Sequence, residues 1–250
     1  MHLRLPNKLV STCLVFLLAA CSAGDGEGRE VAPASTEKLG LFTSLPIYWS
    51  DGEDIATMLQ DGAQEPSWVR EVLESRSELI PLDTLEADVL AGLDRIVLAQ
   101  PRALAPSENV ALDGWLRDGG QALIFADPFL TQHSEFGLGD PRRPFDVVLI
   151  SPILARWGLE LQFDDTQPRD ERIIPAGRSD LPVELAGQFA VLDGEAQASC
   201  TLSAQNLIAD CKIGDGSAVL IADAAVLDTD KDSGERRAAL ESLLSRLQHR

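Results

Sequence analysis

The stretch from Leu93 to Pro128, LDRIVLAQPRALAPSENVALDGWLRDGGQALIFADP, decides the fold class of this chain. Its two apolar runs, 93–99 and 121–126, have the continuous hydrophobicity of strands that are buried on both faces of a parallel sheet. Pro106 begins a helix between them, and Gly119 follows that helix as a residue that tolerates the left-handed conformation. Strand, helix and strand with short connections predict a βαβ unit, which indicates an α/β layer fold.

The pattern on either side extends this unit into a single α/β domain over residues 38–250. Alternating and helical apolar periods predict further elements on both sides of the βαβ unit. Residues 164–187 are expected to form a long surface excursion. The expected strands are 39–45, 78–82, 159–163, 189–192, two cysteine-bearing strands and 217–222, and the expected helices are 66–76, 152–157 and one from about 235.

The N-terminus predicts export. Residues 1–20 combine basic Arg4 and Lys8 with a short apolar run, which is typical of a signal peptide. The run is too short for a membrane span, which needs about 20 residues. It ends in Leu-Ala-Ala-Cys21, which resembles the bacterial lipobox and predicts lipidation of Cys21. The alternative is an ordinary signal peptide with an incidental cysteine. Residues 21–37 are polar and small, as in a flexible tether.

The remaining cysteines predict a disulfide bond. Cys13 leaves with the signal peptide, so Cys200 and Cys211 are the pair left in an exported domain. Exported proteins tend to oxidise such pairs, and the spacing suits a β-hairpin that is closed across its open end. The alternative is two buried free thiols.

The charge balance excludes two classes of partner. The chain has 21 basic and 40 acidic residues and a net charge of −19. Binding to nucleic acid needs clustered Lys and Arg, so no nucleic-acid partner is expected. Electrostatic adhesion to anionic lipid is disfavoured for the same reason, which leaves the lipid on Cys21 as the expected contact with the membrane.

No familiar catalytic motif is present. His133 lies in a polar segment, and the chain has no Gly-x-Ser-x-Gly elbow to partner it. Residues 228–235, DTDKDSGE, partly resemble a calcium loop, but the glycine comes one place late and Ala239 stands where a twelfth-position acid belongs. The alternative is an acidic turn before the last helix. We expect neither a metal nor a cofactor.

Two aspartates carry the strongest chemical signal. Asp127 and Asp223 each end an apolar strand with similar local sequence, Leu-Ile-Phe-Ala-Asp and Leu-Ile-Ala-Asp. Ligands of open α/β sheets bind beyond the carboxyl ends of the strands, so the two carboxylates could hold a ligand or act as acid and base. The alternative is that both cap the backbone of the following turn. The candidate ligand-binding residues are Asp127, Asp223, Thr43, Ser44 and Gln100.

The motifs in residues 93–128 are similar to a family of bacterial proteins associated with ABC transporters, typified by the gliding-motility component GldG. Two other stretches are also similar to this family: Pro152 to Leu159, and Gly214 to Leu220 together with Asp223. The resemblance implies a flavodoxin-like, class I glutamine amidotransferase-like three-layer sandwich with a mainly parallel sheet, here with a C-terminal β-hairpin addition. It also implies that the catalytic Cys and His are absent and that the domain is a binding or accessory subunit.

Together these observations predict a non-catalytic, lipid-tethered periplasmic protein that binds a partner, such as a component of a transporter or of the envelope. Family members are usually anchored in the inner membrane by transmembrane helices, and no such helix is expected in this sequence. Ser22 stands where many lipoproteins retained in the inner membrane carry Asp, which slightly favours the outer membrane. The alternative function is a hydrolase-like enzyme that uses Asp127 and Asp223.

Overall fold

The computed structural model describes residues 37–49, 65–194 and 196–247, which all belong to one compact unit. Cys21, the signal peptide and all of the tether except residue 37 lie outside the described residues. Within the described ranges, no helix is both long and apolar enough to cross a membrane. The elements are β1 (Lys38–Thr43), α2 (Trp68–Glu74), β2 (Glu78–Pro81), α3 (Ala87–Leu90), β3 (Arg95–Ala99), α4 (Pro106–Arg117), β4 (Gln121–Phe125), α5 (Ser151–Arg156), β5 (Leu159–Gln162), β6 (Arg172–Pro175), β7 (Asp180–Val183), β8 (Gln188–Val191), β9 (Ser199–Ser203), β10 (Ile208–Ile213), β11 (Gly216–Ile221), the 3₁₀ turn η1 (Ala225–Leu227) and α6 (Gly234–Leu247).

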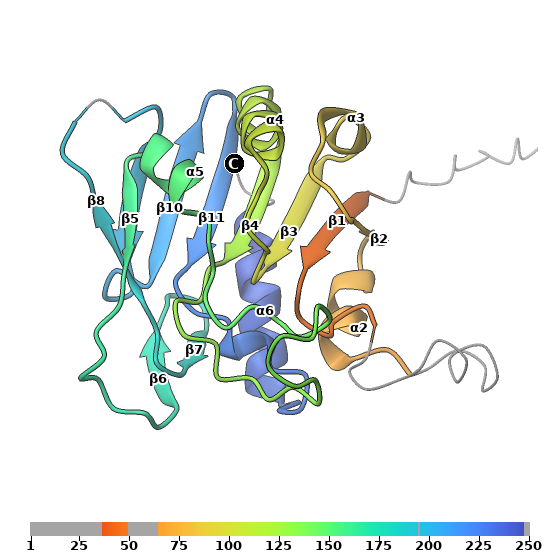
Figure 1. The fold of residues 1–250 in the computed structure, drawn as a ribbon, viewed down its shortest axis with the longest axis vertical. Helices are drawn as coiled ribbons and strands as arrows, with labels where there is room; N and C mark the ends of the chain where they lie inside the picture. Colours follow the sequence, from red (N-terminus) through yellow and green to blue (C-terminus); the bar gives the residue numbers. More distant parts are fainter. Residues whose placement is uncertain (1–36, 50–64, 195, 248–250) are drawn as a thin grey trace, which may run out of the picture. The chain divides into compact units, whose positions relative to one another are not determined.

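The central feature is a seven-stranded, mainly parallel sheet in the order β2-β1-β3-β4-β11-β10-β9 (Figure 1). The first five strands in this order run parallel, and the β9–β10 hairpin adds two antiparallel strands beyond β11. Strands β3 and β4 are parallel neighbours joined by α4, so the predicted βαβ unit is confirmed. The mixed α/β class predicted from the sequence is therefore correct.

The sheet is covered on both faces. Every residue of β3 and β11 is buried, and so are the last four of β4, as their continuous apolar sequence predicts. Helix α4 contacts both α3 and α5, whereas α2 contacts α6, and the two groups cover opposite faces (Figure 1). Gly216 lets β11 begin against the turn after α4, because a Cβ there would lie 2.1 Å from the Leu116 carbonyl oxygen.

The expected surface excursion over 164–187 is wrong. This segment contains the β6–β7 hairpin, and Leu181 and Val183 of β7 are each only 1% exposed. Strand β7 packs against α6 and η1. The hairpin gives no clear sequence signal, because each of its strands has only four residues and the residues around them are mostly polar or glycine. A second hairpin pairs β5 with β8.

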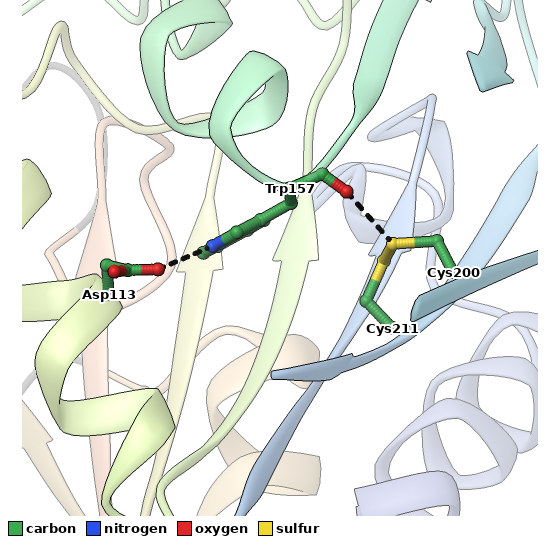
Figure 2. Close-up of a disulfide and its surroundings, with 4 residues drawn as sticks. All are labelled: Asp113, Trp157, Cys200 and Cys211. Carbon is green, nitrogen blue, oxygen red and sulfur yellow. Dashed lines mark hydrogen bonds between the residues drawn. A yellow bond between two sulfur atoms is a disulfide. The ribbon is translucent and has the colours of Figure 1, made fainter. Parts of the chain in front are cut away.

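The predicted disulfide bond is present. Cys200 of β9 lies opposite Cys211 of β10 in the antiparallel register, and the two are bonded (Figure 2). The sulfur of Cys200 is 3.7 Å from the carbonyl oxygen of Trp157, whose indole N–H donates to Asp113 at 3.0 Å. The buried Asp113 carboxylate also accepts from Arg156. The disulfide and Asp113 thus fix Trp157 from both sides.

Candidate functional site at the carboxyl edge of the sheet

Four parallel strands place polar side chains at one edge of the sheet. Thr43 and Ser44 stand at the end of β1, Gln100 directly follows β3, and Asp127 and Asp223 lie two residues beyond β4 and β11. Carboxyl ends of parallel strands meet at the same edge, which is where open α/β sheets carry their ligands. The structure therefore brings the candidate residues to the expected place.

Gln100 links the ends of three strands. Its Nε2 donates to the carbonyl oxygens of Asp127 at 3.1 Å and Phe145 at 2.8 Å, and its Oε1 accepts from the Asp127 N–H at 3.0 Å. The Ser44 hydroxyl donates to the Gln100 carbonyl oxygen at 2.6 Å. Gln100 is fully buried and has a φ of 46°, a left-handed conformation that is costly for a residue with a side chain. Both the nitrogen and the oxygen of its side-chain amide therefore form hydrogen bonds within the protein.

Thr43 also serves the backbone. Its hydroxyl accepts from the Leu45 N–H at 2.9 Å, which is a local turn of the kind that threonine favours. Neither Thr43 nor Ser44 is fully buried. Both are nevertheless engaged in hydrogen bonds that shape the end of β1.

Asp127 and Asp223 are both turn caps. The Asp127 carboxylate accepts from the N–H of Phe129 at 2.8 Å and of Ala224 at 3.1 Å, one at each oxygen. The Asp223 carboxylate accepts from the N–H of Ala225 at 2.6 Å and of Glu184 at 3.0 Å, again one at each oxygen. The structure therefore shows the capping role that the sequence left open as the alternative.

Burial changes the protonation of this pair. Asp127 and Asp223 are 0% and 1% exposed. Burial, which disfavours the charged form, raises the pKa of Asp127 to about 7. Burial and the negative charge of Asp127 raise the pKa of Asp223 well above its ordinary value. The carboxylate of Glu184 pushes both pKa values in the same direction. At neutral pH the pair therefore does not carry two full negative charges.

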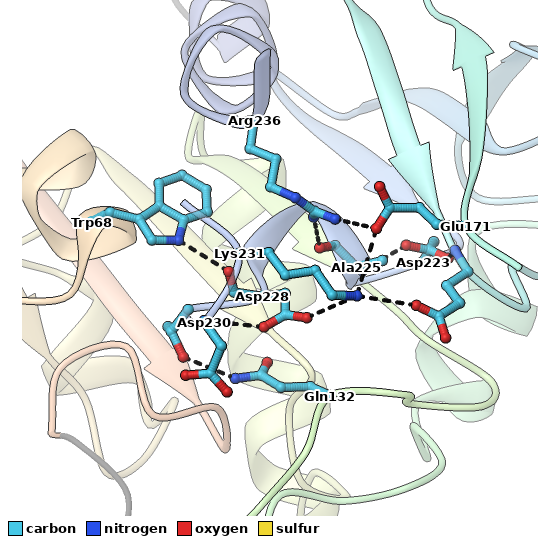
Figure 3. A network of polar contacts seen from close by, with 11 residues as sticks. Trp68, Gln132, Glu171, Asp223, Ala225, Asp228, Asp230, Lys231 and Arg236 are labelled. Carbon is cyan, nitrogen blue, oxygen red and sulfur yellow. Dashed lines mark hydrogen bonds and ion pairs between the residues drawn. The ribbon is translucent and has the colours of Figure 1, made fainter. Parts of the chain in front are cut away.

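An ion-pair network covers the segment that partly resembles a calcium loop (Figure 3). The Lys231 ammonium lies 3.2 Å from Asp228, 3.3 Å from Glu184 and 3.5 Å from Glu171, measured between nitrogen and carboxylate oxygen. Asp228 Oδ1 accepts from the Asp230 N–H. A protein cation thus stands among these carboxylates. Among the described residues, no cluster of three or more acidic, His or Cys side chains could hold a metal ion.

The same segment is anchored on both sides by longer contacts. The Trp68 indole donates to the Asp228 carbonyl oxygen at 3.0 Å, and Arg236 donates to the Ala225 carbonyl oxygen and to Glu171. Asp232 pairs with Arg237 at 2.8 Å. These contacts support the acidic turn that the sequence left open as the alternative to a calcium loop. His133 is largely exposed and lies 3.5 Å from Glu135.

A cleft of about 460 Å³ opens beside the capped edge. Its floor is apolar and buried, with Ile174, Ala186, Gly187 and Leu207. Gly187 joins the floor to the sheet, because its N–H donates to the Ala222 carbonyl oxygen next to Asp223. The polar lining comes from Gln162, Asp164, Thr166, Gln167, Arg172, Gln188 and Gln205.

Sequence reasoning missed this cleft entirely. Its walls come from β5, the β6 region, the start of β8 and the β9–β10 turn, which are up to 45 residues apart in the chain. Glutamines at 162, 167, 188 and 205 form no motif, and the sequence predicts a surface excursion where two of the walls stand. The only sequence signal is a modest excess of glutamines, seven from residue 126 on against four before it, and it gives no spacing to interpret.

Comparison with known proteins yields structural similarity only. No family model and no curated protein matches the chain. Similar solved structures include an exo-β-1,4-mannosidase from an Opitutaceae bacterium (12% identity, TM-score 0.49, 84% of this chain and 35% of that chain). Others are a cytoplasmic protein from Salmonella typhimurium (12%, 0.44, 84% and 98%) and a ThuA-like protein from Bacteroides uniformis (9%, 0.41, 89% and 94%). The chain spans about a third of the length of the glycosidases that it matches.

Proposed function

We propose that this chain is a non-catalytic binding or accessory protein, tethered through Cys21 to a bacterial membrane and facing the periplasm. One observation carries the non-catalytic part. The polar residues at the carboxyl edge, where an α/β sheet normally does chemistry, are used by the protein itself. All four carboxylate oxygens of Asp127 and Asp223 accept backbone N–H groups, and both ends of the Gln100 amide are bonded.

A second feature supports the same proposal. Gln100 occupies a strained connection between a buried strand and a helix, and several hydrolases present their nucleophile on such a connection. Here the side chain is a buried amide, which is not a nucleophile. The five parallel strands with helices on both faces support the finer assignment to a flavodoxin-like, class I glutamine amidotransferase-like sandwich. The proposed relationship to the transporter-associated GldG-like family rests on the sequence motifs, chiefly those in residues 93–128.

The anchor is tested by mass spectrometry of the N-terminal peptide. The chain is expressed in a Gram-negative host, and its membranes are separated by density. We expect the mature protein to begin at a Cys21 that carries acyl chains, because two or more chains give a lasting anchor. The Cys21→Ser variant should lose the modification and leave the membrane fraction. An unmodified Cys21 in a chain that was cut elsewhere contradicts the anchor, and the density of the membrane fraction decides between outer and inner membrane.

The accessory role is tested by cross-linking in living cells before the membranes are solubilised. The expected partner is a permease or ATPase subunit, or another envelope protein, that is recovered with the wild-type chain and lost with Cys21→Ser. Recovery of only the protein itself counts against the role. The hydrolase alternative gains nothing from the geometry, since the two aspartates have no carboxylate oxygen free of a backbone donor.

A further inference from the structure

The cleft beside the capped edge is built as a binding site. Its volume of about 460 Å³ lies within the range of small-molecule pockets, roughly 300–1,000 Å³. Its floor is apolar and its rim is polar, and Phe163 also lines it. The Phe163 ring stacks on Phe129, with centroids 5.6 Å apart and planes 5° from parallel, so its orientation is fixed. Both rings keep a substantial exposed surface, 38% and 44%.

Internal hydrogen bonds hold the walls of the cleft in place. The Gln167 amide donates to the carbonyl oxygens of Asp164 and Ala186, each at 2.9 Å, and accepts from Arg172 at 2.7 Å. This one side chain ties the loop before β6 to the loop before β8. On the opposite wall, the Phe189 N–H donates to the Asn206 carbonyl oxygen at 2.8 Å. The cleft therefore exists before any ligand binds.

Backbone strain is concentrated around this cleft. The described residues contain five non-glycine positions with positive φ, and four of them are Leu185, Ala204, Gln205 and Asn206. Leu185 precedes the lining residues of one wall, and the other three form the β9–β10 turn, from which Gln205 lines the cleft. Strain of this kind persists only where surrounding structure imposes it, and it gathers at functional sites. Gln205 is thus held in place at a conformational cost.

The free polar groups of the cleft indicate an uncharged ligand. The side-chain amides of Gln188 and Gln205 are exposed and make no hydrogen bond to other described residues. Each primary amide offers one acceptor oxygen and two donor hydrogens, which matches hydroxyl groups that both donate and accept. Arg172 adds a buried Nε–H that has no hydrogen-bond partner. Its charge is opposite to that of Asp164, so the lining charges cancel. The net charge of −19 further disfavours an anion.

We infer that this cleft binds an uncharged saccharide of one or two sugar rings, through the Gln188 and Gln205 amides and the face of Phe163. The C–H face of a sugar ring suits the negative face of an aromatic ring, while its hydroxyl groups suit the amides. The inference rests on the proposed function in taking the domain as a binding domain without catalysis. It does not depend on the lipid on Cys21.

The test uses the full chain, purified in a detergent without a sugar headgroup. The probes are cellobiose, maltose, lactose and diacetylchitobiose, followed by saturation-transfer NMR and titration calorimetry. Glucose and glucose 6-phosphate form a matched pair for the charge. We expect saturable binding of at least one uncharged sugar. Gln188→Ala and Phe163→Ala should each weaken it by about five- to tenfold, the worth of one good contact.

The matched control is Gln197→Ala, which alters an exposed glutamine outside the cleft lining and should change the affinity by less than about twofold. The inference is overturned if no uncharged sugar binds saturably, if neither cleft variant weakens binding, or if only the phosphorylated sugar binds. Cleavage of the bound sugar in the NMR sample would contradict the proposed non-catalytic function and leave the binding site standing. An unmodified Cys21 would contradict the anchor alone.

Discussion

Replacing Asp127 by Asn tests whether the buried carboxylate pair shapes the pH dependence of stability. Both Asp127 oxygens accept a backbone N–H, from Phe129 and from Ala224. Asparagine has one acceptor oxygen, so one of these N–H groups would face the amide NH₂ instead. An unsatisfied buried donor costs about 1–3 kcal/mol. At pH 4 the variant should therefore be less stable than the wild type by about that amount.

The sign of the pH effect follows from the raised pKa. Asp127 titrates at about 7 in the folded protein and at 3.8 in the unfolded chain. The folded state therefore holds the proton more tightly, and its contribution to stability is complete below pH 3.8 and is lost as the pH rises to 7. A difference of about 3 pKa units corresponds to at most about 4 kcal/mol. The Asn variant does not lose this contribution to stability as the pH rises, because its amide does not titrate. It also removes a negative charge next to Asp223.

The free energy of unfolding of residues 36–250 is measured by denaturant titration at half-unit steps from pH 4 to 8. We expect the destabilisation by Asp127→Asn to shrink with rising pH and to reverse near neutrality. Asp164→Asn is the control, since Asp164 caps the turn at Thr166 from an exposed position and its hydrogen bonds lower its pKa. Its stability difference should be flat above about pH 5. A destabilisation by Asp127→Asn that stays constant or grows with pH refutes the reasoning.

Three further outcomes are expected from the same unfolding measurements. The double variant Cys200→Ala/Cys211→Ala should lose about 3 kcal/mol, because the bond closes a loop with a sequence separation of 11, and a reducing agent should destabilise only the wild type. Lys231→Met should cost about 1 kcal/mol at low salt and less at high salt, because it leaves the carboxylates of Asp228, Glu171 and Glu184 without their shared cation; an equal loss at both salt concentrations would contradict this. Ala204→Gly should raise stability by roughly 0.5 kcal/mol, since relief of left-handed strain exceeds the entropy that glycine adds to the unfolded chain; a loss of stability would show that the turn is not strained.

The parallel core could be predicted from sequence because each of its signals is local. The apolar runs of β3 and β4 report burial on both faces, and Pro106 and Gly119 mark the ends of α4 within one or two residues. The disulfide was predictable from the compartment and from the spacing of two cysteines. In these elements each local preference agrees with the final fold, and such agreement is what sequence patterns detect.

The site could be predicted only in part. Strand ends placed Asp127 and Asp223 at one edge, but nothing in the sequence says whether a carboxylate at such an edge binds a ligand or caps a turn. The role of the carboxylate depends on which backbone N–H groups from distant parts of the chain lie beside it, such as that of Glu184, 39 residues before Asp223. The cleft is a harder case, because Gln162, Gln188 and Gln205 meet only through the pairing of short hairpins.

One long connection between two strands covers the capped edge and also forms the cleft beside it. Strands β4 and β11 are parallel neighbours, and a connection between such strands needs only a dozen residues or so. Here residues 126–215 intervene, and they hold α5 and six strands. The first part of this long connection covers the edge, where Val148 donates to the Asp127 carbonyl oxygen and Phe145 accepts from Gln100.

The later part of the same connection builds the cleft walls from β5 to the β9–β10 turn. The long connection therefore closes the position at which a parallel sheet usually presents its chemistry and offers a polar cleft at its side. This division separates stability from binding. Substitutions at Asp127 or Gln100 should act on the free energy of unfolding, whereas substitutions at Gln188 should act on ligand affinity with little effect on folding. If Gln188→Ala instead destabilised the domain as strongly as Asp127→Asn does at pH 4, the cleft would be a structural part of the core and not a site.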